Sequence, residues 1–221
     1  MAVADGVSTA GRGGEGADLA VRAVTEFAGR RPSGWGEREC AAAMDFANDA
    51  LERAGGDAAL ELSTTLIVAL LTSTVTGGAV ASLARTGDSA AFFLSAAGAW
   101  REIFDGGATQ ADVGSGDGLD LLSTATDVLP WPQGRDGRRA TVETASLELV
   151  EGSALVLLTD GVANPLRDGP STVAPGLAAV LRAIADGELS ALELAQAADF
   201  SRRGAHDDRT ILVVWPRAPR G

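Results

Sequence analysis

GAHDDRTILVVW, residues 204–215, runs from a polar turn directly into an apolar strand. Asp207 and Asp208 stand just before the run Ile211–Trp215, which has the length and aliphatic content of a buried strand. Carboxylates are costly to bury unless they are paired or hold a metal ion. The segment therefore predicts a strand that brings acidic groups to one end of a sheet.

Three further aspartates stand at the ends of apolar runs: Asp5 after Ala2-Val3-Ala4, Asp88 after Ala79–Thr86, and Asp160 after Leu155–Thr159. Mg²⁺ and Mn²⁺ take oxygen ligands, so carboxylates that converge from several strand ends suit such ions. Glycine follows Asp5 and Asp160, and it allows the backbone carbonyl to approach an ion closely. Five other Asp-Gly pairs, at 105, 117, 136, 168 and 186, are interpreted as turns, because a preceding strand with a hydrophobic run sets Asp5 and Asp160 apart.

The periodicity predicts strand, two helices, several strands, two helices and a final strand. We expect strands at 1–4, 64–72, 79–86, 90–94, 99–104, 141–149, 154–158 and 211–215, and helices at 17–30, 36–54, 176–185 and 190–200. Residues 105–137 lack a steady period and predict a long, partly mobile loop. No linker divides the chain, so residues 1–221 are expected to form one domain with a mostly β core faced by a helix pair on each side.

Composition excludes several kinds of site. All 18 basic residues are Arg, so the chain has no phosphate-binding loop lysine and no Schiff-base lysine. Cys40 is the only cysteine and His206 the only histidine, which excludes multi-cysteine and paired-histidine zinc sites; Cys40 is expected to be a small buried side chain.

The net charge of -12 disfavours nucleic acid and anionic membrane surfaces as partners. The uncharged stretch 63–84 is interrupted by Gly77-Gly78 and reads as two strands joined by a turn, not as a membrane helix. The chain opens without a secretory leader, so a cytoplasmic location is expected.

The ordered set of motifs resembles the metal-dependent serine/threonine protein phosphatases of type 2C, especially compact bacterial members. It consists of Asp5-Gly6, Gly87-Asp88-Ser89, Asp160-Gly161 and the run 204–210, and Ser63-Thr64-Thr65-Leu66 resembles the start of a central strand of that family. The resemblance implies a four-layer αββα sandwich of two packed, mainly antiparallel sheets. It also implies a monomer that acts on a phosphorylated protein.

Carried over residue by residue, the resemblance makes Asp5, Asp160 and Asp207 the catalytic metal ligands. Asp5 would bridge two Mn²⁺ or Mg²⁺ ions, with the Gly6 carbonyl as a further ligand, and Asp160 and Asp207 would hold one of these ions. Asp88 would form a third site with Asp160, and Asp208 would lie just behind the ligands. Metal-activated water would then attack phosphorus without a covalent intermediate.

The sequence also departs from the family pattern. The family begins one strand earlier, with an Arg for the substrate phosphate, and that strand is expected to be missing here; Arg12 is a candidate substitute. Val7 stands where some members have a histidine, and His206 is a candidate proton donor. The stretch 105–137 occupies the place of a variable flap, and Arg135, Arg138 and Arg139 are candidate phosphopeptide contacts.

Two other interpretations compete with a metal-dependent phosphatase. Without the first strand, the chain is interpreted alternatively as a weak or inactive relative that binds phosphoproteins as a regulatory module. A phosphohydrolase with an aspartate nucleophile, like the haloacid dehalogenases, requires two Asp residues separated by one position. The neighbours of Asp5 at that spacing are Val3 and Val7, so this motif fails.

Overall fold

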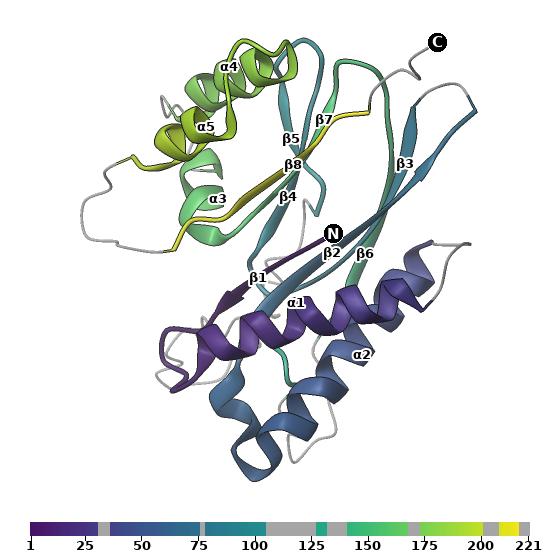
Figure 1. The fold of residues 1–221 in the computed structure, drawn as a ribbon, viewed down its shortest axis with the longest axis vertical. Helices are drawn as coiled ribbons and strands as arrows, with labels where there is room; N and C mark the ends of the chain where they lie inside the picture. The colour runs from purple at the N-terminus through teal and green to yellow at the C-terminus, as the bar shows by residue number, and fades with distance from the viewer. Residues whose placement is uncertain are drawn as a thin grey trace, which may run out of the picture.

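The computed structural model describes residues 1–30, 36–75, 78–104, 127–131, 141–167, 173–200 and 208–216. Within these residues, two four-stranded antiparallel sheets stack face to face, and helices cover both outer faces (Figure 1). None of the helices in the described part is long and apolar enough to cross a membrane.

The first sheet has the order β1-β2-β3-β6. Its strands are β1 (Ala2–Gly6), β2 (Thr64–Ser73), β3 (Ala79–Thr86) and β6 (Glu143–Leu149). Beyond the paired ends of β2 and β3, the Thr74 N–H donates to the Gly78 carbonyl at 2.9 Å. This confirms that the uncharged stretch forms a strand pair, as its glycine interruption predicts.

The second sheet has the order β5-β4-β7-β8. Its strands are β5 (Trp100–Glu102), β4 (Ala90–Leu94), β7 (Ala154–Leu158) and β8 (Ile211–Val214). Leu158 of β7 lies opposite Ala90 of β4 on one side and opposite Ile211 of β8 on the other. The register therefore aligns the start of β4, the end of β7 and the start of β8 at one end of the sheet.

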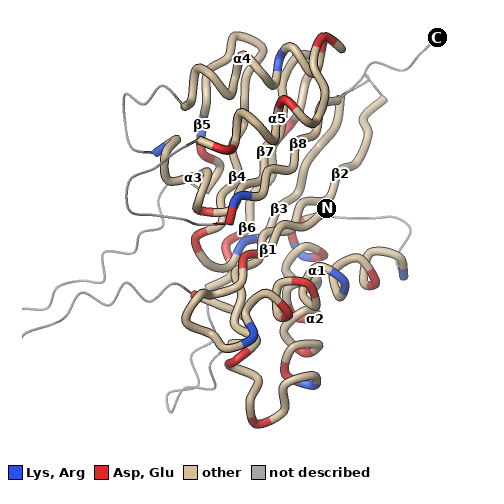
Figure 2. Tube along the Cα trace, turned by 60° about the vertical axis from the view of Figure 1, so that its left-hand side comes forward, with Lys and Arg blue, Asp and Glu red and all other residues tan. Residues whose placement is uncertain are grey.

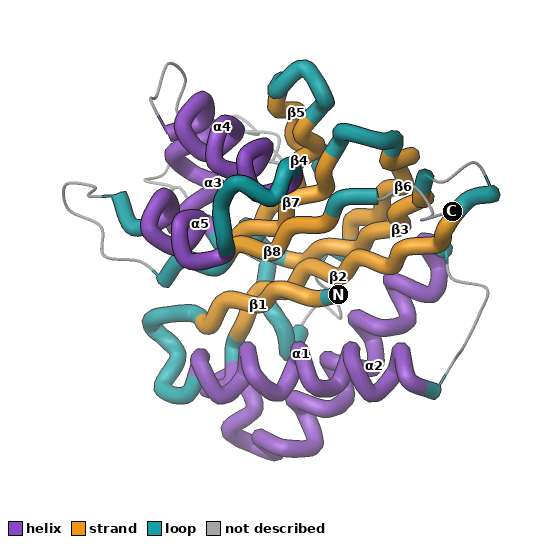
Figure 3. Tube along the Cα trace, turned by 45° about the horizontal axis from the view of Figure 1, so that its top comes forward, coloured by secondary structure: helices purple, strands orange, loops and turns teal. Residues whose placement is uncertain are grey.

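Helices α1 (Gly13–Gly29) and α2 (Glu37–Gly55) cover the first sheet, and a 3-10 helix, η1 (Gly56–Leu62), leads from α2 into β2. On the second sheet lie α3 (Asp160–Arg167), α4 (Val173–Ala185) and α5 (Ala191–Ala198), as Figure 3 shows. The predicted pair is present on the first sheet. The described residues place three helices on the second.

Strand side chains alternate between two layers of core. In β2, Leu66 and Val68 pack against α1 and α2, whereas Ile67 and Ala69 face the second sheet. The same alternation in β7 sends Leu155 and Leu157 into the space between the sheets. Because both faces of these strands are buried, their sequences read as continuous apolar runs.

Helix α1 begins at Gly13, four residues before the predicted start. The glycine-rich run therefore enters the helix instead of remaining a loop. At Gly16 a Cβ atom would lie 1.9 Å from the Leu62 carbonyl oxygen, so only glycine allows α1 to approach the end of η1 this closely.

Helix α3 was not predicted. It is eight residues long and contains both Gly161 and Pro165, which are poor helix formers.

The end of the predicted long loop is packed against the fold. Leu129 is fully buried, and its backbone exchanges two hydrogen bonds of 2.8 Å with Thr64. The Trp131 N–H donates to the Asn48 side-chain oxygen at 2.8 Å. Residues 127–131 thus attach to the start of β2 and to α2, while most of the stretch 105–137 lies outside the described residues.

Cys40 is fully buried on α2, and its Sγ donates to the Ser82 carbonyl at 3.1 Å. Burial raises the pKa of the thiol to about 12. This confirms the prediction of a small buried side chain.

Candidate metal centre

The end of β1 carries the first predicted ligand, Asp5. In the antiparallel register Asp5 lies opposite Thr65 and Gly6 opposite Thr64. The Thr64 hydroxyl donates to the Asp5 carbonyl at 2.8 Å and so fixes the backbone of this residue. A Cβ on Gly6 would lie 2.3 Å from the Gly13 carbonyl carbon. Gly6 is therefore required for the close approach of β1 to the start of α1.

A buried hydrogen bond joins the start of β2, opposite the end of β1, to the loop that carries Asp88. The Thr65 hydroxyl, directly across from Asp5, lies 2.7 Å from the Ser89 hydroxyl. Gly87 has φ +92°, and a Cβ there would lie 2.7 Å from the Thr65 Cβ. The loop before β4 thus rests on the first residues of β2 and links the two sheets at this end.

Asp160 lies beyond the same end of the second sheet. Ala90 of β4 pairs with Leu158 of β7. Asp88 stands two residues before Ala90, and Asp160 stands two residues after Leu158, so both lie at the same end of this strand pair. Asp160 is the first residue of α3, where its negative charge complements the helix dipole. Both side chains are partly exposed.

Hydrogen bonds of Thr159 attach the last motif, residues 204–210, to the end of β7 through its described residues 208 and 210. The Thr159 hydroxyl donates to the Asp208 carbonyl at 3.0 Å and accepts from the Thr210 N–H at 2.9 Å. Residues 208–210 therefore lie beside the residue that precedes Asp160. Asp208 itself is exposed. Asp207 and His206 lie outside the described residues.

Arg167 is a charged residue of this region that the sequence did not identify. Burial lowers its pKa, but hydrogen bonds to Glu102 and the nearby carboxylates of Glu102, Asp88 and Asp160 raise it, and the net direction is upward. Asp88 and Asp160 thus lie within electrostatic range of the same guanidinium. Figure 2 shows acidic and basic segments together at this end of the strands. The spacing of Asp160, Asn164 and Arg167 along one helix face is the signal that could have indicated the residue.

The acidic side chains at this end of the sheets are of the type that a hard divalent ion binds. Asp5, Asp88 and Asp160 supply carboxylate oxygens at the ends of strands, and all three are partly exposed, so a hydrated ion can reach them. Within the part of the chain that the structure describes, no three acidic, histidine or cysteine side chains are close enough to share an ion. The predicted fourth ligand, Asp207, lies outside this part.

The arginines predicted to contact the substrate are Arg12 and three residues of the stretch 135–139. Arg12 is partly exposed and forms two hydrogen bonds with Glu15, of 2.8 and 2.5 Å, at the start of α1. These bonds and the charge of Glu15 raise the pKa of Arg12. Its guanidinium is therefore engaged with Glu15. Arg135, Arg138 and Arg139 lie outside the described residues.

Known proteins share this fold over nearly the whole chain. PppA, a key regulatory component of T6SS in Pseudomonas aeruginosa, is 20% identical, with 97% of this chain and 84% of that chain covered and a TM-score of 0.57. The phosphatase MsPP from Mycobacterium smegmatis, solved with cacodylate, is 19% identical over 97% and 86%, with a TM-score of 0.61. The catalytic domain of the phosphatase PstP, solved with two manganese ions, is 19% identical over 96% and 85%, with a TM-score of 0.60.

No curated protein matches the chain in sequence. The family profile described as protein phosphatase 2C matches residues 1–199. The match covers Asp5, Asp88 and Asp160 in the order that the motifs predict. The chain belongs to the protein phosphatase 2C family.

Proposed function

We propose that the chain is a metal-dependent protein phosphatase that hydrolyses phosphoserine and phosphothreonine. The observation that carries this proposal is that hydrogen bonds tie three motif-bearing segments together at one end of the sheets. Thr64 and Thr65, at the start of β2, bond to Asp5 at the end of β1 and to Ser89 just before β4, and Thr159 joins the end of β7 to residues 208–210. Family membership supports the same chemistry.

In the proposed site, Asp5, Asp160 and Asp207 are the catalytic ligands of two Mn²⁺ or Mg²⁺ ions, with the Gly6 carbonyl beside Asp5. Asp88 joins Asp160 at a third ion. When bound, such ions lower the pKa of a water molecule and stabilise the charge that develops at phosphorus. The hydroxyls of Thr64, Thr65 and Thr159 form hydrogen bonds that fix the strand ends from which these ligands project.

A negatively charged phosphorylated substrate is compatible with an acidic protein if its site holds divalent cations. With a net charge of -12 the protein as a whole repels a phosphorylated, acidic peptide. Bound divalent ions become the largest local charges in such a site and reverse the sign of the field there. We infer that a phosphorylated protein is attracted only to the metal-loaded site. We also propose that the chain acts as a single-domain monomer.

The test is turnover of p-nitrophenyl phosphate and of a phosphothreonine peptide, with Mn²⁺, with Mg²⁺ and with chelator. We expect activity that requires the ion and falls at least about a hundredfold in Asp160→Asn, which keeps the shape but removes the charge. Asp186→Asn is the matched control, because Asp186 belongs to another Asp-Gly pair, in an exposed turn after α4. It should retain full activity.

The outcomes separate the proposal from its alternative. Turnover that is independent of the ion, or equal in Asp160→Asn and wild type, would contradict the proposed chemistry. Phosphopeptide binding without any turnover would instead identify a regulatory binding module.

A further inference from the structure

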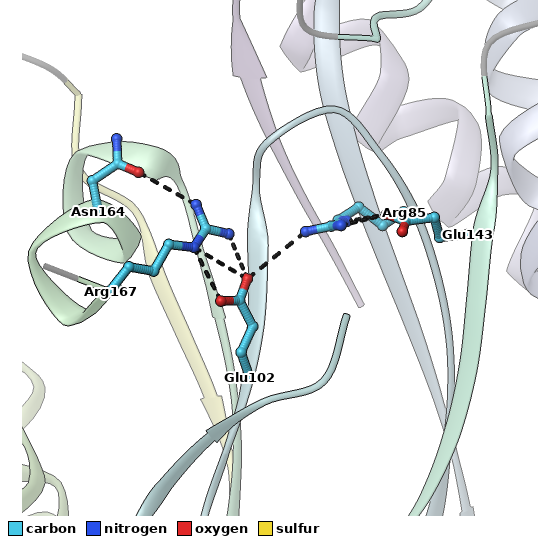
Figure 4. Close-up of polar contacts among 5 residues, drawn as sticks. All are labelled: Arg85, Glu102, Glu143, Asn164 and Arg167. Carbon is cyan, nitrogen blue, oxygen red and sulfur yellow. Dashed lines mark hydrogen bonds and ion pairs between the residues drawn. The ribbon is translucent and has the colours of Figure 1, made fainter. Parts of the chain in front are cut away.

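A chain of alternating charges crosses from the first sheet to α3 (Figure 4). Arg85 on β3 donates through Nε and an amino group to Glu143 on β6. Its other amino group lies 3.9 Å from Oε1 of Glu102 on β5. Arg167, at the end of α3, donates to the same carboxylate through Nε, at 3.2 and 3.1 Å, and through an amino group at 2.5 Å. Glu102 therefore serves two arginines.

The charges of Arg85 and Glu102 are largely buried, so each depends on its ion-pair partners. The side chain of Arg85 is 7% exposed and that of Glu102 is 19% exposed, so neither charge is fully solvated. Arg85 also lies over the Phe104 ring, 4.8 Å from its centroid, and is held by Glu143 whether or not Glu102 is present. Arg167 is different, because Glu102 is the carboxylate that accepts its hydrogen bonds in the described structure.

The helix itself links Arg167 to the candidate metal centre. Arg167 and Asp160 are the last and first residues of α3 and are seven positions apart, which places them on one helix face about 10 Å apart. Asn164, between them, accepts a hydrogen bond from Arg167 at 3.3 Å. Asp88 also lies within electrostatic range of this arginine. A long, flexible arginine side chain in this position can reach toward either carboxylate unless something holds it.

We propose that Glu102 is a positioning residue that holds Arg167 against β5 and stops this cation from closing on Asp88 and Asp160, where it would compete with a divalent ion. This inference rests on the proposed function, because it assumes that these two carboxylates bind metal. It concerns the occupancy of the site rather than the chemical step. Glu102 has this role because β5 places its carboxylate between Arg167 and Arg85.

The Mn²⁺ dissociation constants of three variants test this role. If the pair between Glu102 and Arg167 were merely structural, removing it would not give the pattern of affinities described next. We expect Glu102→Gln to weaken Mn²⁺ binding about tenfold in titration calorimetry, since the released guanidinium then competes for the carboxylates. The double variant Glu102→Gln, Arg167→Gln should recover to within about threefold of wild type, because the competitor is gone. Arg167→Gln alone should bind Mn²⁺ as tightly as wild type or more tightly.

Glu143→Gln is the matched control within the same network. It removes a carboxylate that pairs with Arg85 and leaves the Arg167 pair intact. We expect it to lower the unfolding midpoint and to leave the Mn²⁺ dissociation constant unchanged within about twofold.

Each outcome bears on the inference. Unchanged Mn²⁺ affinity in Glu102→Gln, or a double variant as weak as the single one, overturns it. If Glu102→Gln does not fold, Arg167→Gln still decides, because weaker Mn²⁺ binding in that variant contradicts competition by Arg167. A wild-type chain that neither binds Mn²⁺ nor turns over phosphate would refute the proposed function itself, which is a different result.

Discussion

Replacing Thr65 with valine tests the hydrogen bond that joins the two sheets beside the candidate metal centre. Valine keeps the shape of threonine and removes its hydroxyl. Thr65 is 4% exposed and Ser89 is 0% exposed, and their hydroxyl oxygens are 2.7 Å apart. The substitution therefore leaves the Ser89 hydroxyl in a place that water does not reach.

The expected cost follows from that burial. A buried polar group left without its partner costs about 1–3 kcal/mol, whereas the net value of the bond itself is only about 0.5–1.5 kcal/mol. We therefore expect Thr65→Val to lower the free energy of unfolding by about 2 kcal/mol. Ser89→Ala should cost a similar amount. The double variant should cost less than the sum of the two, since it leaves no hydroxyl stranded.

Urea unfolding of the wild type, both single variants and the double variant measures this directly. We expect a coupling free energy of about 1 kcal/mol or more between the two positions. Mn²⁺ affinity should fall in each single variant, because the Asp88 loop loses its attachment to the strand across from Asp5. Additive stability effects, or full Mn²⁺ affinity in a folded single variant, would refute the role given to this bond.

Three further predictions test other parts of the fold. Gly16→Ala should destabilise the chain by about 1–3 kcal/mol, because its Cβ would meet the Leu62 carbonyl, whereas Gly14→Ala, with open space around its Cβ, should stabilise it by about 0.5–1 kcal/mol in thermal unfolding. Burial raises the pKa of Cys40 from 9.0 to about 12, so the unfolded state loses its proton first and stability should fall by about 1.4 kcal/mol per pH unit from pH 9 upward. The chain has no Lys or Tyr to titrate in this range, and Cys40→Ala should remove that slope in urea unfolding. Mn²⁺ at about 100 times its dissociation constant should stabilise the fold by about 2.7 kcal/mol in scanning calorimetry, and chelator or Asp160→Asn should abolish the effect.

Periodicity in the sequence was sufficient to predict most of the fold. Strands buried on both faces, such as β2 and β7, appear as long aliphatic runs, and each was placed within a residue or two. Helix α3 was not predicted, because it has only eight residues, including Gly161 and Pro165, and so gives little periodic signal. A helix this short depends on tertiary packing for its stability. The start of α1 was misplaced because glycine favours loops in general, while Gly16 is needed here for contact with Leu62.

The candidate site was harder to predict than the fold. Strand ends and the order of the motifs indicated Asp5, Asp88 and Asp160, and the hydrogen bonds of their neighbours bring these ends together. The pair between Glu102 and Arg167 joins positions 65 residues apart, and no local pattern states which carboxylate an arginine will meet. Asp207 stays a prediction, since it lies outside the described residues.

The way in which the strand ends are held has a consequence for the charge of the site. Acidic groups at neighbouring strand ends repel one another, and a fold can hold them together with arginines or with neutral hydrogen bonds. Here the hydroxyls of Thr64, Thr65 and Thr159 make the attachments. Arginines in their place would cancel the negative potential that attracts a divalent ion. Arg167 lies within range of the carboxylates and is held by Glu102 on β5, which preserves the negative field at the end of the sheets for a cation.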